Sequence, residues 1–493
     1  MSASRYRRGV GANSLDHALA PVVPVVVAVA GLACLAGFAR ATALASLHVP
    51  LDPNEGWNAF HTAAAMAGHG LYPAPESFMI NNYPPLSFYA VGELGKWLGD
   101  DIIAGRAISL ASFVSVCASI GWAVRQMGGM RLAALFSALF FAGVLLLASD
   151  YVGMNDPQLL GHAIQLAALI VLLRDRKSRL VIFASAALFV AGWFVKHNLF
   201  ALPLAALVWL ALYDRRNALK FAASMIALLT FGLLAFRVSF GINLLAQLDS
   251  ARTYFLRLLY DNLTSWLAVG SIPLAALAGL SIRRRSDPNV VLVALYAALS
   301  VISGAYFLGG AGIDVNAMFD ADIALALAAG LALGALLRGP GPLTHLTGRA
   351  LAVGCMAPLA VMALANSDAH DAGYWFHPMQ DEAALASRDI AFLRAHPGPA
   401  MCESLAFCYW AAKPAEVDVF NLDQQLAAHG RNAAPFLRLL DAHRFAAIEL
   451  DEIKPFPLPP DMEAAIRRDY TIDHIDDEGV FLVPRSRAGP SHA

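Results

Sequence analysis

The sequence predicts an α-helical polytopic membrane protein with about 11 transmembrane helices, followed by a small C-terminal α/β domain. Three observations predict this fold class. Of the 493 residues, 58% are apolar and only 15% are charged, whereas soluble chains carry about 25% charged residues. Apolar runs long enough to cross a bilayer recur throughout residues 1–366. The sign of the net charge then changes near residue 366.

The net charge of −2 hides a difference between two parts of the chain. Residues 1–365 hold 24 Lys and Arg against 17 Asp and Glu, whereas residues 366–493 hold 11 against 20. We expect a transmembrane domain over 1–366, a soluble α/β domain over 367–485 and a disordered tail over 486–493. The composition excludes a disordered chain, a nucleic-acid-binding protein and a secreted scaffold built on disulfides.

Eleven apolar runs suit tilted helices across a hydrocarbon core of about 30 Å. Their approximate limits are 20–44, 102–124, 131–149, 157–173, 180–195, 198–213, 219–240, 263–282, 289–308, 317–337 and 350–366. Lys196 and His197 mark a break between the fifth and sixth runs. Basic residues precede the first run, as in a secretory signal, but its length and the spans that follow favour a retained helix.

Basic residues collect in every second loop between these spans, and this pattern indicates the orientation of the chain. The set comprises Arg5, Arg7, Arg8, Arg125, Arg131, Arg174, Arg176, Lys177, Arg179, Arg215, Arg216, Lys220, Arg283, Arg284, Arg285, Arg338 and Arg349. Because cytoplasmic loops are rich in Lys and Arg, we expect a cytoplasmic N-terminus. With eleven spans, the C-terminal domain then lies on the outer side.

The first outer loop carries acidic and aromatic residues directly where the first span ends. It opens with Leu-Asp52-Pro-Asn-Glu55-Gly-Trp57 and later reads Asn-Asn-Tyr83-Pro-Pro-Leu. An N-cap of a helix starting near Glu55 would explain Asp52, and the Pro pair would start another helix. Two carboxylates three residues apart at a membrane exit favour a site instead, because carboxylates are costly near a bilayer.

Three further outer loops carry polar residues. Asp156 lies between the third and fourth spans, Lys196 and His197 between the fifth and sixth, and Asn316 between the ninth and tenth. An N-cap before Pro157 explains Asp156 equally well, and snorkelling to the interface is the alternative for Lys196. Together these loops supply a base, a cation and neutral donors, which are the groups that an active site needs.

The order of these motifs resembles that of the GT-C superfamily of integral membrane glycosyltransferases, which includes protein O-mannosyltransferases and lipid A aminoarabinose transferases. The resemblance is closest to the bacterial family-39-like transferases of lipopolysaccharide and cell-wall glycans. It covers about residues 45–320 and is strongest over 52–106. Those proteins often carry Asp-Glu at the start of loop one, where this chain has Asn54-Glu55 and, two residues earlier, Asp52. The base is therefore either Asp52 or Glu55.

The resemblance implies a GT-C fold and transfer of a hexosyl or pentosyl group from a polyprenyl-phosphate-linked donor, with inversion. The acceptor would be a glycan or lipid of the cell envelope, on the periplasmic face of the bacterial inner membrane. Asp52 or Glu55 would accept the proton of the acceptor hydroxyl, with Asp156 positioning the acceptor. The groups expected at the donor phosphate are Lys196, His197, Arg106 and Asn316. Trp57 and Tyr83 would position the acceptor or the loop.

No cofactor and no metal are expected, although the acids of the outer loops suit a divalent ion such as diphosphate-donor relatives use. Two other functions stay open. One is a transporter or flippase of lipid-linked glycans, and the other is a glycan polymerase or ligase with a lipid-diphosphate donor. Transporters usually show inverted repeats and polar residues at mid-membrane. The largely charge-free middles of these spans argue against transport.

The C-terminal part alternates helical and strand-like segments. We expect a helix over 381–396, a strand over 400–409, two helices over 422–443, a strand over 445–450 and a hairpin over 470–484. The hairpin would turn at 476–479. Cys402 and Cys408 lie six residues apart, so a disulfide between them would have to cross a turn. We expect this domain to cover the membrane part, with acceptor recognition as the alternative.

Overall fold

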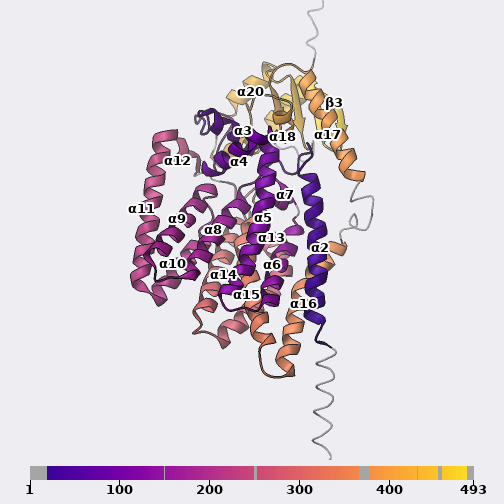
Figure 1. The fold of residues 1–493 in the computed structure, drawn as a ribbon. Helices are drawn as coiled ribbons and strands as arrows, with labels where there is room; N and C mark the ends of the chain where they lie inside the picture. Colours follow the sequence, from indigo (N-terminus) through magenta and orange to yellow (C-terminus); the bar gives the residue numbers. More distant parts are fainter. Residues whose placement is uncertain are drawn as a thin grey trace, which may run out of the picture.

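The computed structural model describes residues 19–148, 150–241, 243–248, 252–365, 377–429, 431–452 and 458–485. A helix lies at each of the eleven predicted spans. They are α2 (Val22–Leu44), α5 (Asp101–Gln126), α6 (Arg131–Leu146), α8 (Gln158–Arg174), α9 (Arg179–Val195), α10 (Ala201–Tyr213), α11 (Arg215–Phe240), α13 (Leu256–Arg283), α14 (Pro288–Phe307), α15 (Phe319–Leu337) and α16 (Pro342–Ala365). The expected multi-pass helical architecture is thus confirmed (Figure 1).

Within the described ranges, seven of these helices are long and apolar enough to cross a membrane. They are α2, α5, α11, α13, α14, α15 together with its preceding 3₁₀ turn, and α16. The other four, α6, α8, α9 and α10, are apolar but shorter. The interruption between two helices that we expected at Lys196 and His197 is present, because α9 ends at Val195 and α10 begins at Ala201.

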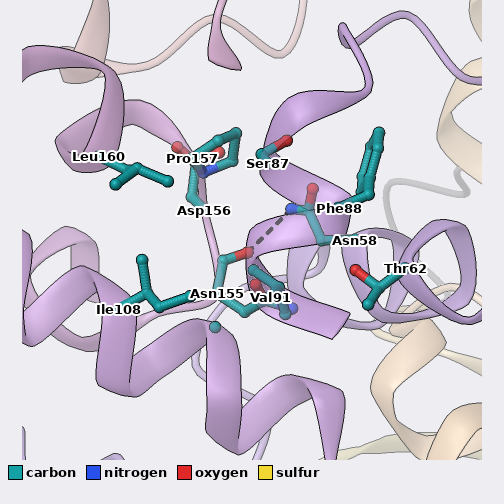
Figure 2. Close-up of a pocket in the computed structure, with 11 residues that line it drawn as sticks. Asn58, Thr62, Ser87, Phe88, Val91, Ile108, Asn155, Asp156, Pro157 and Leu160 are labelled. Carbon is teal, nitrogen blue, oxygen red and sulfur yellow. Dashed lines mark hydrogen bonds between the residues drawn. The ribbon is translucent and has the colours of Figure 1, made fainter. Parts of the chain in front are cut away.

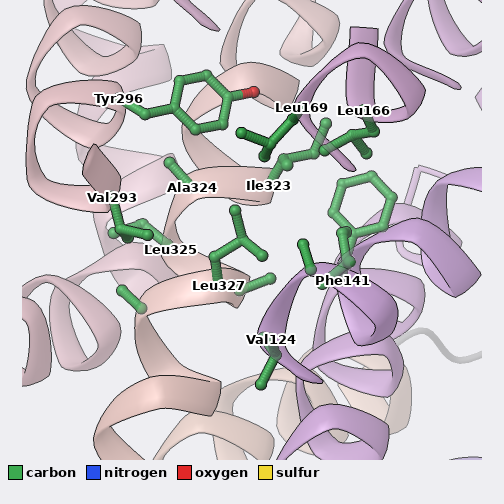
Figure 3. Packing of buried hydrophobic residues seen from close by; sticks show 14 of the residues in the cluster. Val124, Phe141, Leu166, Leu169, Val293, Tyr296, Ile323, Ala324, Leu325 and Leu327 are labelled. Carbon is green, nitrogen blue, oxygen red and sulfur yellow. The ribbon is translucent and has the colours of Figure 1, made fainter. Parts of the chain in front are cut away.

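Helix α15 forms the centre of the membrane part. It packs against α5, α6, α13, α14 and α16, and almost every residue from Phe319 to Leu333 is buried. A helix that is apolar on all faces lies either in a protein core or in lipid, and the neighbours of α15 place it in the core. Figure 3 shows Ile323 and Leu327 of α15 among Phe141, Leu166 and Tyr296 of three other helices.

Short helices lie at one end of this bundle. Loop one contains α3 (Asn54–Ala67) and α4 (Leu86–Leu98) at the predicted positions, and α7 (Asp150–Gly153), α12 (Asn243–Leu248) and the 3₁₀ turn η1 (Val315–Met318) lie in later loops. Pro85 directly precedes α4. Helix α3 ends at Gly68, whose φ of 76° is left-handed and suits glycine. Asp100 caps α5 by accepting hydrogen bonds from the backbone N–H groups of Ile102 and Ile103.

The C-terminal domain has a four-stranded sheet with the order β1-β2-β4-β3. Its elements are α17 (His377–Ala395), β1 (Ala400–Cys402), α18 (Leu405–Trp410), α19 (Val419–His429), α20 (Ala434–Asp441), β2 (Ala447–Leu450), α21 (Pro460–Asp469), β3 (Tyr470–Asp476) and β4 (Gly479–Pro484). β1 pairs parallel with β2, and the other pairs are antiparallel. The hairpin turns between Asp476 and Gly479, as predicted.

One expected element of this domain is wrong, because the strand expected over 400–409 ends at Cys402 and residues 405–410 form α18. A disulfide joins Cys402 to Cys408, so the chain folds back on itself there. The predicted domain boundary at 366–367 and the predicted tail over 486–493 fall outside the described residues, and both stay predictions.

The domain docks on the loops at the end of the bundle, above α3 and α4 in Figure 1. Helix α18 packs on α3. At Gly56, an added Cβ would lie 2.0 Å from the backbone nitrogen of Ala406, so only glycine allows this approach. Tyr409 and Trp410 contact Asp101 and Asp100 at the start of α5. The domain therefore fixes loop one as well as covering it.

Candidate functional site

Glu55 and Arg106 form a fully buried, two-pronged ion pair. The Nε of Arg106 donates to Oε1 of Glu55 at 2.7 Å, and Nη2 donates to Oε2 at 2.5 Å. The same guanidinium donates to the carbonyls of Leu47 and Val49 at 2.7 and 2.6 Å. Both side chains are 0% exposed. Every strong donor of Arg106 is therefore used to hold the chain between α2 and α3.

Asn155 connects this ion pair to the loop that precedes α8. Its backbone N–H donates to Oε1 of Glu55 at 2.9 Å, and its carbonyl accepts from Nδ2 of Asn58 at 2.8 Å. Gly105 makes the space, because an added Cβ there would lie 1.7 Å from Oδ1 of Asn155. The sequence did not single out Asn58, Gly105 or Asn155 as site residues. Only the position of Asn155 directly before Asp156 offered a signal.

Asp156 and Lys196 form a second buried ion pair. Nζ of Lys196 lies 3.2 Å from Oδ2 of Asp156, and Oδ1 of Asp156 accepts from the backbone N–H of Gln158 at 2.7 Å. The Lys196 ammonium also lies 3.9 Å from the centre of the Tyr83 ring. Burial acts to lower the pKa of Lys196, but the charge of Asp156 and the Tyr83 hydroxyl outweigh it, so the pKa is raised. The ammonium therefore stays charged.

Asp52 is the acid of this group without a cationic partner. It lies half-buried before α3, and its Oδ1 accepts from the backbone N–H and the side chain of Asn54 at 2.8 and 2.7 Å. No ion pair within the described part of the chain includes it. Burial, with smaller contributions from the carboxylates of Asp156 and Glu55, outweighs the hydrogen bonds from Asn54 and raises its pKa to about 6. An acid with this pKa is ionised at neutral pH and is a stronger base than a solvated aspartate.

The remaining predicted residues lie around these two pairs. Trp57 is buried, donates to the carbonyl of Ile80 at 2.9 Å and contacts Tyr83 edge-on. His197 is exposed next to Lys196. Asn316 is half-buried in η1, and its carbonyl lies 3.4 Å from Nε2 of Gln158. The four loops that carry these residues therefore meet at one end of the bundle.

A polar chain continues from this site into the bundle. The side chain of Gln158 bonds Nε2 of His162 at 2.9 Å, and Nδ1 of His162 lies 3.7 Å from Oδ1 of Asp320. The hydroxyl of Tyr296 donates to the same oxygen of Asp320 at 2.5 Å. Gln158, His162 and Tyr296 were not predicted, because an isolated polar residue in an apolar helix carries no sign of its partner.

A possible metal group lies elsewhere in the described residues. Asp389, His474 and Asp476 offer ligand atoms within 4.8 Å of one another in the C-terminal domain. Arg388 forms ion pairs with both of these carboxylates. The group is therefore an ion-pair network with its own cation, remote in sequence from Asp52, Glu55 and Asp156.

No protein-family model and no curated protein sequence matches the chain. Among solved structures, the fold is similar to that of ArnT from Cupriavidus metallidurans. The likeness to ArnT bound to undecaprenyl phosphate has a TM-score of 0.58 at 15% identity, over 94% of this chain and 98% of that chain. Apo ArnT has a TM-score of 0.57 over the same shares, also at 15% identity.

A weaker likeness, with a TM-score of 0.48 and 12% identity, is to the oligosaccharyltransferase of Archaeoglobus fulgidus in complex with Zn and sulfate. It covers 93% of this chain and 73% of that chain. The likeness to ArnT confirms the fold class: the chain has the GT-C fold that its loop motifs led us to expect.

Proposed function

We propose that this protein is a membrane glycosyltransferase that transfers a sugar from a polyprenyl-phosphate-linked donor to a glycan or lipid of the cell envelope. The observation that carries this proposal is that Asp52, an acid in no ion pair of the described residues, interacts electrostatically with Asp156, the carboxylate that holds the buried ammonium of Lys196 at one end of the bundle. The ArnT structure with the same fold was solved with undecaprenyl phosphate. The basic loops support a periplasmic position for this end, in the inner membrane of a bacterium.

Asp52 is the base in this proposal. The acceptor hydroxyl loses its proton to the Asp52 carboxylate as its oxygen attacks the anomeric carbon. The new carbon–oxygen bond forms on the face opposite the bond to phosphate, which breaks and leaves its electron pair on the polyprenyl phosphate. One displacement of this kind inverts the anomeric centre. Glu55 is less suited to the role, because Arg106 and two backbone N–H groups already occupy its oxygens.

Lys196 neutralises the charge that develops on the leaving phosphate. Its ammonium is buried, which strengthens its attraction for an anion relative to a solvated lysine. Asp156 holds this ammonium in place, and the Tyr83 ring lies beside it. We assign Arg106 to the support of loop one rather than to phosphate, because Glu55 and two carbonyls use its donors. His197 and Asn316 are assigned to the rim of the donor site.

The proposal is tested by an Asp52→Asn variant assayed for transfer from polyprenyl-phosphate sugars in membranes. We expect loss of transfer with normal protein levels, because Asn keeps the shape of the side chain and cannot accept a proton. Asp261→Asn is the matched control, since Asp261 is an exposed acid near the start of α13 that pairs with Arg257. Transfer at the wild-type rate by the Asp52→Asn protein contradicts the proposal.

The sugar and the acceptor are identified by mass spectrometry of lipid and glycan pools from cells with and without the protein. Loss of one sugar from an envelope glycan, with accumulation of its polyprenyl-phosphate form, is the expected result. Unchanged sugars together with a lipid-linked glycan held on one side of the membrane would indicate a flippase instead.

A further inference from the structure

A small cavity lies beside Asp156, on the side of loop one. It is bounded by α3, α4, α5, the segment 155–157 and the start of α8. Figure 2 shows Ser87, Asp156, Asn155 and Asn58 around the same gap. The volume that the centre of a water molecule can occupy in this cavity is about 10 Å³. By this measure one water needs roughly 10–15 Å³, so the cavity has room for a single water.

Two hydroxyl groups that line this cavity have no hydrogen-bond partner. They belong to Thr62 of α3, which is 0% exposed, and Ser87 of α4, which is 3% exposed. Buried hydroxyls almost always have a partner, because an unpaired polar group away from water is costly. Two unpaired hydroxyls at one small cavity are thus a sign that a polar molecule belongs there.

Other hydroxyls of the membrane part are paired: Ser109, Ser137 and Ser185 bond carbonyls of neighbouring segments, and others bond carbonyls of their own helices. Ser115 in α5 donates to the carbonyl of Ala111 at 2.8 Å, and Thr42 in α2 donates to that of Phe38 at 2.8 Å. Thr62 and Ser87 make no such bond. Their helices therefore leave both hydroxyls available to a molecule in the cavity.

We propose that this cavity binds one ordered water that bridges the hydroxyls of Thr62 and Ser87 and donates to the Asp156 carboxylate. Water is the occupant that fits, since the volume suits one molecule and three polar partners satisfy it. The bridge ties the carboxylate that holds Lys196 to two helices of loop one. Resting on the proposed function, this makes Thr62 and Ser87 positioning residues for the donor-phosphate site.

The first test is an experimental structure of the full chain at a resolution that shows ordered water. We expect one peak at hydrogen-bond distance, about 2.7–3.2 Å, from both hydroxyl oxygens. An empty cavity, or one in which the two hydroxyls bond to the protein instead, overturns the proposal. This observation does not depend on whether the protein transfers sugar.

The second test is the double variant Thr62→Val/Ser87→Ala. If the cavity is dry, removal of two unpaired hydroxyls raises the apparent unfolding temperature. If water bridges them, the temperature falls, and we expect kcat to drop about tenfold with little change in donor KM. The single variant Thr62→Ser keeps a hydroxyl at this position and should keep kcat near the wild-type value.

Thr42→Val/Ser115→Ala is the matched control, because the same groups are removed where each bonds its own helix. A raised unfolding temperature, or a wild-type kcat in the Thr62→Val/Ser87→Ala protein, refutes the bridge. If Asp52→Asn proves fully active, the proposed function fails, while the water peak and the sign of the temperature change still decide this inference.

Discussion

The ion pair of Glu55 and Arg106 permits a test that separates support of the site from its chemistry. In Glu55→Gln, the Arg106 guanidinium stays fully buried and loses the carboxylate that neutralises it. Breaking a buried pair by removing one partner costs about 3–5 kcal/mol. Folded proteins are stable by only about 5–15 kcal/mol, so this one change removes a large part of the stability of the chain.

Asp52→Asn should behave differently, because no ion pair in the described residues depends on Asp52. The Asn side chain keeps the Oδ1 acceptor that Asn54 uses, so the change in stability should be small. We therefore expect Asp52→Asn to fold normally without transferring sugar. Glu55→Gln should show a lowered apparent unfolding temperature and a reduced yield of folded protein.

The assay is thermal unfolding of the detergent-solubilised protein, measured beside donor binding and transfer. The double variant Glu55→Leu/Arg106→Met removes both charges together, so its loss of stability should be smaller than the sum of the single losses. Glu55→Gln protein with wild-type unfolding temperature and donor affinity but no transfer would refute the reasoning. Glu55 would then be a chemical group of the reaction.

Three further predictions follow from the site. Lys196→Met should weaken binding of polyprenyl phosphate by about tenfold or more, because the buried cation is lost. The control is Lys96→Met, which removes an exposed lysine that pairs with Glu93. Equal affinities of the Lys196→Met and wild-type proteins would contradict the phosphate role. The transfer rate should rise with pH through about 6 and then level off. Burial raises the pKa of Asp52 to about 6, and the base acts only when it is deprotonated. A rate that stays constant from about pH 5 to pH 8 would contradict the role of Asp52 as base. Gly56→Ala should displace the C-terminal domain and abolish transfer, since the new Cβ would lie 2.0 Å from the backbone of Ala406. Limited proteolysis measures the displacement. The control is Gly279→Ala, where the space is open, and it should leave the cleavage pattern unchanged.

The sequence predicted the helices well, because apolar runs and alternating basic loops depend on the bilayer rather than on neighbouring residues. The break at Lys196 and the helix start near Glu55 are local features of this kind. The strand expected through Cys408 is wrong because short apolar runs suit both helix and strand. There the disulfide to Cys402 and the packing on α3 decide the outcome.

The pairing of site residues could not be predicted in the same way. Asp156 forms an ion pair with Lys196 because α8 packs beside α9. Glu55 forms one with Arg106 because α3 packs on α5. Each pair depends on the relative rotation of two helices, which neither segment encodes locally. The slot of Asn155 against Gly105 is a contact of the same kind. The sequence therefore indicated which loops carry the candidate site, but it did not indicate which of their residues pair.

The packing of α18 against Gly56 has a consequence for the order in which parts of the protein fold during synthesis. Translation proceeds from the N-terminus, so α3 is made early, whereas α18 lies in the last fifth of the chain. The backbone of α18 forms one wall of α3, so loop one lacks that wall until the final segment has been made and has folded around its disulfide. A nascent or prematurely ended chain can insert its helices, yet it cannot complete the site that they carry.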